Sequence, residues 1–340
     1  MVYSTEYRVG PDGPAPEQPT GPRAGAGAAA ARGAEARARS GCRAAVLGRP
    51  IDHSLSPVLH STAYSRLGLD WTYEAIECDE SGLPAMFDRV RSEPGWVGLS
   101  LTMPLKTAAV GLLDEVDPTA ALLGAVNTVV VGENGWLTGF NTDVDGVGVA
   151  LRRALAGRVP SQPLVLGAGG TARAALAALA RAGASRVAVV ARRPAAVTEL
   201  IGIGAQLGIS VTPLPWSILD SGVPSGPDLV VATTPAGATD GLATQKWPMT
   251  CPLVELLYHP WPTALAASAY RAGARVVGGL EVLVGQAVEQ VRHFTGQAVD
   301  DGALRAAGQA ALEARAAAAR QSQAAPQEPP QDPASGACPN

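Results

Sequence analysis

One of the few lysines in this sequence, Lys106, stands where it could exchange a proton with a substrate. It follows an apolar segment, 96–101, that reads as a strand, and it begins a predicted helix, whose positive end would make release of a proton easier. Asp143 ends another predicted strand and could accept a hydroxyl hydrogen bond while pairing with Lys106. The alternatives are an exposed lysine at a helix start and an aspartate that only caps the helix beginning at Val144.

Other polar side chains stand at similar positions and could hold a small polar ligand. Ser54 and Ser56 lie near a predicted helix N-terminus, which favours a carboxylate, although both could simply be capping residues. Tyr258 stands on a loop braced by prolines after a predicted strand. Gln286 lies about a turn into a helix that follows two glycines, and it could be either a ligand contact or a buried core amide.

A glycine-rich turn follows the buried strand 164–166 and precedes an alanine-rich helix. Its G-x-G-x-x-A spacing is typical of dinucleotide-binding turns, in which backbone N–H groups at a helix N-terminus hold the pyrophosphate. The residues concerned are Gly167, Ala168, Gly169, Gly170, Thr171 and Ala172. Flavin proteins, methyltransferases and ordinary strand–helix connections use the same turn.

The strand after this turn ends in Arg192 and Arg193, about 25 residues beyond Gly167, near the distance at which the ribose contact is expected. An acidic residue there would bind the 2′-hydroxyl of NAD, whereas arginine suits the 2′-phosphate of NADP. The sequence therefore favours NADP over NAD. The alternative is a solvated basic loop.

Composition excludes several classes of function. The net charge of −4 provides no basic surface for nucleic acid or for a membrane, and only 4% of residues are aromatic. The cysteines and histidines lack the spacing of metal ligands, so we expect neither a metal site nor a disulfide framework. No apolar stretch approaches the ~20 residues that span a bilayer, and no signal peptide is evident. We expect a cytoplasmic protein.

Alternating strands and helices predict an α/β fold with two domains. Strands are predicted at 43–48, 73–78, 96–101, 125–131, 137–143, 164–166, 187–191, 209–212, 229–232, 253–256 and 275–277. Besides the helix after the glycine turn, helices are predicted at 57–67, 83–92, 106–113, 144–155, 280–294 and 302–319. The alternation before the turn at 133–135 favours a mostly parallel sheet, and that turn favours a hairpin. Residues 1–41 and 321–340 have the composition of disordered tails.

Eight motifs in order, over roughly residues 44–295, resemble the shikimate dehydrogenase family. They are GRPIDHSLSP (48–57), LSLTMPLK (99–106), GAVNT (124–128), GFNTD (139–143), GAGGTARA (167–174), TTPAG (233–237), YHP (258–260) and GGLEVLVGQ (278–286). The chain departs from the usual family residue at positions that include Ser100, Ala191, Arg193, Glu255 and Val282.

The resemblance implies a substrate domain (42–143), a doubly wound Rossmann-type NADP domain (144–276) and C-terminal helices (277–320) that return to the substrate domain. It implies reversible, NADP-linked reduction of 3-dehydroshikimate to shikimate on the route to chorismate and aromatic amino acids, with Lys106 and Asp143 as the catalytic pair. The substrate pocket would be lined by Ser54, Ser56, Thr102, Asn127, Asn141, Tyr258 and Gln286. The resemblance adds Thr233 and Gly279 to the cofactor site, with Gly279 near the nicotinamide.

Rival interpretations remain. The same pocket would suit a quinate or aminoshikimate dehydrogenase, because the residues do not distinguish these substrates by their ring substituents. A regulatory protein would bind NADP without turnover. A reductase resembling the folate dehydrogenases would leave Ser54, Ser56 and Tyr258 without a purpose. The oligomeric state, a monomer or a homodimer, is also open.

Overall fold

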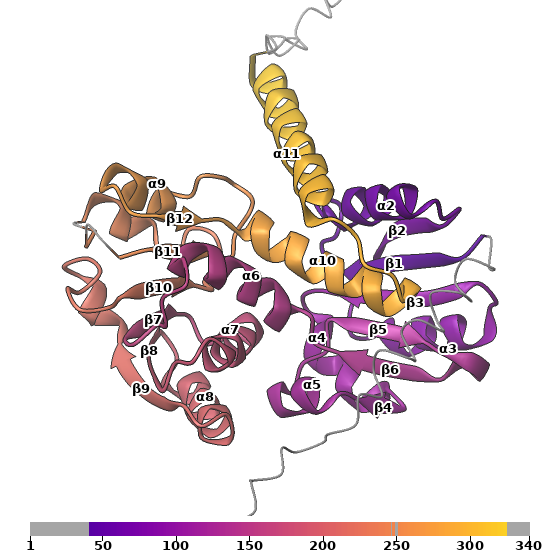
Figure 1. Cartoon of the computed structure of the whole chain (residues 1–340), viewed down its shortest axis with the longest axis horizontal. Coiled ribbons are helices and arrows are strands. Elements are labelled where there is room, and N and C mark those ends of the chain that lie inside the picture. Colours follow the sequence, from indigo (N-terminus) through magenta and orange to yellow (C-terminus); the bar gives the residue numbers. More distant parts are fainter. Residues whose placement is uncertain (1–40, 246, 249–250, 325–340) are drawn as a thin grey trace, which may run out of the picture.

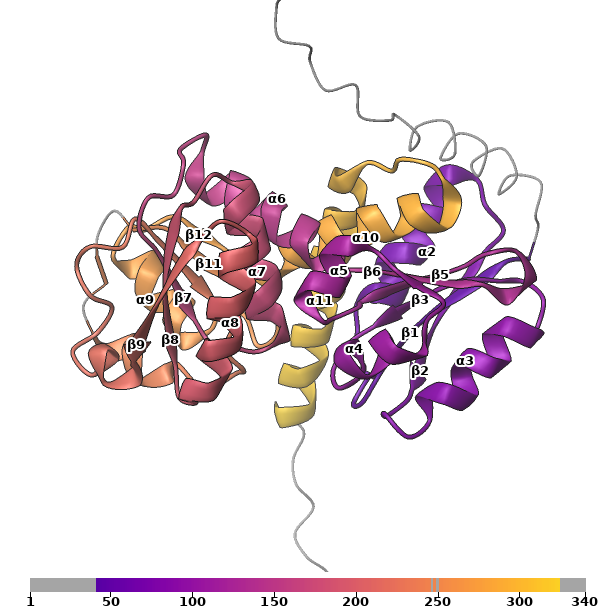
Figure 2. The same cartoon turned by 90° about the horizontal axis from the view of Figure 1, so that it is seen from below.

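The computed structural model describes residues 41–245, 247–248 and 251–324, which form two six-stranded sheets connected by helices (Figure 1). Seen from below, the two sheets occupy opposite sides of the molecule (Figure 2). The expected tails lie outside the described residues, apart from Gly41 and the segment 321–324, which continues the last helix.

The first sheet is mixed, with strand order β2-β1-β3-β5-β6-β4. Its strands are β1 (Arg43–Gly48), β2 (Thr72–Glu77), β3 (Trp96–Leu101), β4 (Glu115–Val116), β5 (Thr128–Val131) and β6 (Leu137–Phe140). The parallel pairing predicted before the hairpin is confirmed, because β1 pairs in parallel with both β2 and β3. Beyond it, β5 is antiparallel to β3 and β6, since the turn at η2 (Glu133–Gly135) leads β5 directly back into β6.

Short helices connect these strands: α2 (Ser56–Leu67), α3 (Leu83–Ser92), α4 (Leu105–Ala108), η1 (Ala109–Leu112) and α5 (Pro118–Leu123). Pro57 lies in the first turn of α2, where its missing N–H costs nothing, and Gly68 ends the helix at a φ of 66°. The helix predicted at 106–113 is instead one α-helical turn followed by a 3₁₀ turn. The unpredicted α5 is too short for a periodic pattern and is capped by Asp117, which accepts from the N–H of Thr119 at 2.8 Å.

The second sheet is entirely parallel and doubly wound, with order β12-β11-β10-β7-β8-β9. Its strands are β7 (Pro163–Leu166), β8 (Arg186–Ala191), β9 (Ser210–Pro215), β10 (Leu229–Ala232), β11 (Leu253–Glu255) and β12 (Val276–Val277). The strand order reverses between β7 and β10. In such sheets, ligands bind beyond the carboxyl ends of the strands at this reversal point.

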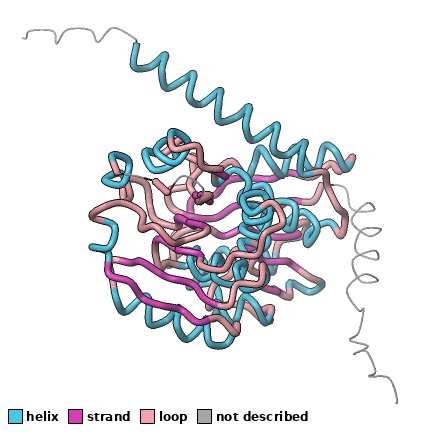
Figure 3. Tube along the Cα trace, turned by 60° about the vertical axis from the view of Figure 1, so that its left-hand side comes forward, coloured by secondary structure: helices cyan, strands magenta, loops and turns pink. Residues whose placement is uncertain are grey.

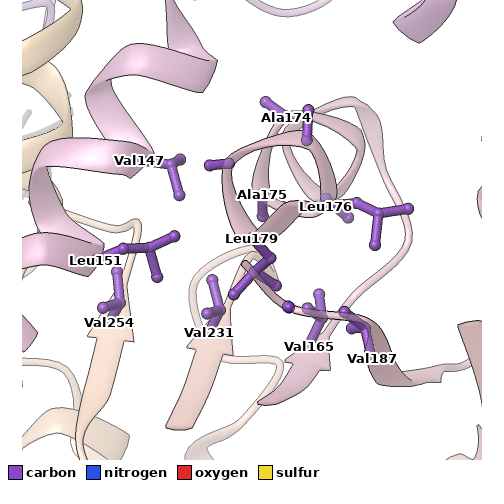
Figure 4. Close-up of a cluster of buried hydrophobic side chains, with 14 of the residues drawn as sticks. Val147, Leu151, Val165, Ala174, Ala175, Leu176, Leu179, Val187, Val231 and Val254 are labelled. Carbon is purple, nitrogen blue, oxygen red and sulfur yellow. The ribbon is translucent and has the colours of Figure 1, made fainter. Parts of the chain in front are cut away.

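Helices cover both faces of this sheet: α6 (Asp143–Leu155), α7 (Gly170–Arg181), α8 (Pro194–Gln206), η3 (Trp216–Leu219), η4 (Asp240–Thr244) and α9 (Ala264–Arg271). Leu151 of α6 and Leu179 of α7 point toward Val165, Val231 and Val254 on the strands (Figure 4). These side chains are almost fully buried. Truncating such a leucine to alanine typically costs about 2–5 kcal/mol of unfolding free energy.

Helices α6 and α10 (Gly279–Thr295) lie between the two sheets (Figure 1). They cross closely because both have glycine at the crossing: a Cβ on Gly146 would lie 2.4 Å from the carbonyl oxygen of Val282, and one on Gly285 would lie 2.9 Å from the Cα of Gly146. The last helix, α11 (Asp301–Ala324), packs beside α2 and then projects beyond the rest of the molecule (Figure 3). None of the described helices is both long and apolar enough to cross a bilayer.

Candidate functional site

A pocket of about 310 Å³ lies where the carboxyl ends of β1, β3, β6 and β11 meet the start of α10. Pairing in the first sheet explains why distant residues converge there, because Thr128 lies opposite both Ser100 of β3 and Phe140 of β6. Ten of the predicted site residues line this pocket: Ser54, Ser56, Thr102, Lys106, Asn127, Asp143, Thr171, Tyr258, Gly279 and Gln286.

Lys106 and Asp143 form an ion pair on the pocket wall, with Nζ 2.6 Å from Oδ2. Their side chains are 22% and 7% exposed, so Lys106 is not the solvated lysine of the alternative interpretation. The helix-capping interpretation of Asp143 is also excluded, because Thr142 occupies the cap position of α6 and both carboxylate oxygens of Asp143 bind side chains.

Asn127 orients the second oxygen of this carboxylate. Its Nδ2 donates to Oδ1 of Asp143 at 2.8 Å, while its own Oδ1 accepts from the hydroxyl of Thr128 and from the N–H of Thr142, each at 2.8 Å. Because two donors converge on the amide oxygen, the NH₂ group must face Asp143. A longer contact of 3.4 Å joins Nδ2 to Oε1 of Gln286.

Gln290 supports this arrangement and was not predicted from the sequence. Only 1% of it is exposed, it lines the pocket, and its Nε2 donates to Oγ1 of Thr128 at 3.2 Å. The described residues provide no hydrogen-bond partner for its Oε1. The available signal was its position one helical turn after Gln286, which places both amides on the same face of α10.

Hydroxyl groups also line the pocket. Oγ of Ser54 accepts from the N–H of Ser56 at 3.2 Å, and no side chain caps α2 at its cap residue, Leu55. Burial raises the pKa of the Tyr258 phenol. Ser100, one of the departures from the family pattern, also lines the pocket, and its Oγ accepts from the Tyr73 hydroxyl at 2.7 Å.

Asn141 is the one predicted substrate residue that does not line this pocket. It is 6% exposed, and its Nδ2 donates to the carbonyl of Ala125 at 2.8 Å. The side chain is therefore engaged in joining the end of β6 to the segment that leads into Asn127.

The glycine-rich turn connects β7 to α7 as predicted. Gly167 has a φ of 107°, which favours glycine, and a Cβ there would lie 2.5 Å from Oγ1 of Thr233. Thr233 itself donates to the carbonyl of Leu166 at 2.9 Å, so it joins the carboxyl ends of β7 and β10. Ala172 is fully buried, which allows α7 to pack on the sheet.

The start of α7 is open. Gly169 is the cap residue without a side-chain cap, and a Cβ on Gly169 or Gly170 would meet no atom within 4 Å. Ala168 is half-buried beside them. The first residues of the helix therefore leave room beside their backbone for a pyrophosphate, which the free N–H groups of a helix start can bind.

Arg192 and Arg193 follow β8, the strand next to β7, and both are exposed. Gly279, at the start of α10, lines the pocket, and a Cβ there would be 2.2 Å from the carbonyl oxygen of Leu256. The residues present fit a dinucleotide that carries a 2′-phosphate, because the start of α7 leaves room for a pyrophosphate, the two exposed arginines could bind a phosphate, and Gly279 leaves bare backbone at the pocket.

Comparisons with known proteins agree with this site. The family model described as "Shikimate dehydrogenase substrate binding domain" matches residues 46–129. Shikimate dehydrogenase (NADP(+)) of Geobacter metallireducens is 37% identical over 277 residues, which cover 78% of this chain and 96% of that protein.

Two solved structures extend the similarity to the fold. Mycobacterium tuberculosis shikimate dehydrogenase is 39% identical with a TM-score of 0.70, covering 79% of this chain and 99% of that one. The Thermus thermophilus enzyme in complex with NADP(H) and shikimate is 35% identical with a TM-score of 0.68, covering 80% and 100%. The chain therefore belongs to the shikimate dehydrogenase family.

Proposed function

We propose that this protein catalyses the reversible, NADP-dependent reduction of 3-dehydroshikimate to shikimate. The observation that carries the proposal is the Lys106–Asp143 ion pair on the wall of a pocket that also includes Thr171 of the glycine-rich turn and Gly279 of α10. A proton-exchanging pair and a dinucleotide crevice thus share one cavity, which a dehydrogenase requires.

Two groups of pocket-lining residues suit the two kinds of polar group on shikimate. Ser54, Ser56 and Tyr258 present hydroxyl groups near the start of α2, and they would bind the carboxylate. Asn127 and Gln286 present amides beside the ion pair, and they would bind ring hydroxyls. Thr102 lines the same pocket.

The crevice beside this pocket would hold NADP. Backbone N–H groups at Gly169, Gly170 and Thr171 would bind the pyrophosphate, and Arg192 with Arg193 would bind the 2′-phosphate. Bound NADP supplies or accepts the hydride. Gly279 would border the nicotinamide, because it lines the pocket that also holds Lys106 and Asp143.

Lys106 would exchange the proton that accompanies hydride transfer at C3 of the substrate. In the reducing direction, its Nζ would donate a proton to the developing alkoxide oxygen, and in the reverse direction it would take the hydroxyl proton. Asp143 would hold the ammonium group in place and accept the hydroxyl hydrogen bond, while Asn127 would prevent its carboxylate from rotating. Positioned acid–base groups of this kind contribute about 10²–10⁴-fold in rate.

The test is turnover by the purified full chain with shikimate and with quinate, each with NADP⁺ and NAD⁺, followed through the absorbance of the reduced nicotinamide. We expect the largest kcat/KM with shikimate and NADP⁺. A preference for quinate would assign the rival dehydrogenase activity, and NADP binding without turnover would indicate a regulatory protein. Cytoplasmic location and a monomeric or homodimeric state remain predictions.

A further inference from the structure

A charged side chain of the last helix holds the loop that carries Ser54, a residue that lines the pocket. Arg315 of α11 donates from Nη1 to the carbonyl of His53 at 2.6 Å and from Nη2 to the carbonyl of Ser54 at 3.0 Å. Ser54 itself lines the pocket. One guanidinium group therefore holds two consecutive carbonyls of the loop that carries this serine.

The packing of α11 fixes where this guanidinium lies. Leu304 is fully buried, and a Cβ on Gly308 would lie 2.7 Å from Cδ1 of Leu280 and 3.2 Å from Cδ2 of Leu59, so α11 approaches both α10 and α2 closely. Arg305 adds an ion pair to Glu281 of α10 at 2.9 Å. Arg315 lies farther along this anchored helix, beside the start of α2.

The charge of Arg315 is not neutralised by an acidic partner. Within the described part of the chain no Asp or Glu forms an ion pair with it, whereas Arg305 and Arg153 of the same region each contact two carboxylates. Carbonyl oxygens satisfy its N–H groups but leave the net charge of the guanidinium in place. The charge also acts on Tyr258, because it opposes the rise in pKa that burial imposes on the phenol.

We propose that Arg315 is a specificity-determining residue for anionic substrates, because it positions the Ser54 loop and adds a positive charge behind the part of the pocket lined by Ser54, Ser56 and Tyr258. The inference rests on the proposed function, in which these three residues bind the substrate carboxylate. Because Arg315 is only partly buried, its charge should favour binding of an anion beside these three residues only modestly, and salt should screen the effect.

The test compares Arg315→Ala, Arg315→Lys and the control Arg320→Ala, an exposed arginine on the same helix, in the full chain. Arg315→Ala should raise the KM for shikimate about three- to tenfold, with kcat and the KM for NADP⁺ within about twofold of the wild type. Raising the ionic strength should lower the wild-type kcat/KM and should affect Arg315→Ala less. Arg315→Lys should retain the salt dependence, and Arg320→Ala should match the wild type.

Two results would overturn the inference. An unchanged KM in Arg315→Ala would show that the guanidinium does not serve the pocket. If kcat/KM fell equally in Arg315→Ala and Arg315→Lys, and if the salt dependence of Arg315→Ala matched that of the wild type, Arg315 would only hold the loop in place and its charge would not act on the substrate. The proposed function is judged on the activity of the wild type alone, whereas this inference is judged on the ratio of each variant's KM to that of the wild type. If quinate is the substrate, the same ratios are measured with quinate. If turnover is absent, the ratios are those of the shikimate dissociation constants, measured by calorimetry.

Discussion

Lowering the pH should destabilise this protein through one buried side chain, His60. The imidazole is fully buried in α2, its Nδ1 hydrogen-bonds the carbonyl of Ser56 at 2.9 Å, and its ring stacks on Tyr73 with centroids 3.9 Å apart. No described residue hydrogen-bonds its Nε2. Burial lowers the pKa of His60 from 6.5 to about 4, and the hydrogen bond to Ser56 only partly opposes this change.

The size of the effect follows from the two pKa values. Between pH 6.5 and pH 4 the unfolded chain binds a proton at this histidine that the folded chain does not bind. The free energy of unfolding therefore falls as the pH falls through this range, and it levels off below the folded-state pKa. The loss should be about 2 kcal/mol by pH 5 and about 3 kcal/mol in total.

Urea unfolding of the wild type and of His60→Phe at several pH values between 8 and 5 tests this prediction. Phenylalanine preserves the stacking on Tyr73 but binds no proton, so the variant should lose about 2 kcal/mol less than the wild type between pH 8 and pH 5. It should also carry a cost of about 1 kcal/mol at every pH, because the hydrogen bond to Ser56 is lost. The exposed His259 offers a control, His259→Gln, that should follow the wild type. Equal pH dependence in wild type and His60→Phe would refute the reasoning.

Three further predictions concern the site. Lys106→Met should lower kcat by about 10²–10⁴-fold in steady-state assays, and an unchanged kcat would remove Lys106 from the chemistry. Arg192→Ala should raise the KM for NADP⁺ about tenfold or more with little change for shikimate, since hydrogen bonds between charged groups contribute about 1.5–3 kcal/mol. Equal changes in both KM values would contradict a contact to the 2′-phosphate. Gln290→Leu removes the donor to Thr128. The factor by which kcat falls should be about three to ten times the factor by which KM rises, and the free energy of unfolding should fall by about 1 kcal/mol. A full kcat in the folded variant would show that Thr128 orients Asn127 without Gln290.

Long periodic segments and glycine turns were predictable because their causes are local. The turn at Gly167 depends on a positive φ that favours glycine, and the strand and helix around it are buried apolar runs. Helices α5, α8 and α9 were missed, as was the break of the predicted helix 106–113 into two kinds of turn. Of these, α5 depends on a single cap by Asp117 rather than on a repeating pattern.

The candidate site likewise depends partly on local sequence and partly on tertiary structure. Residue types at strand ends were sufficient to nominate Lys106 and Asp143, which are 37 positions apart, but each retained an ordinary structural explanation until the sheet register brought them together. The roles of Gln290 and Arg315 depend entirely on tertiary packing. Arg315 is 261 positions from Ser54, and its contact exists because α11 packs closely on α10 and α2. No local pattern encodes such a contact, because it is set by how whole helices cross.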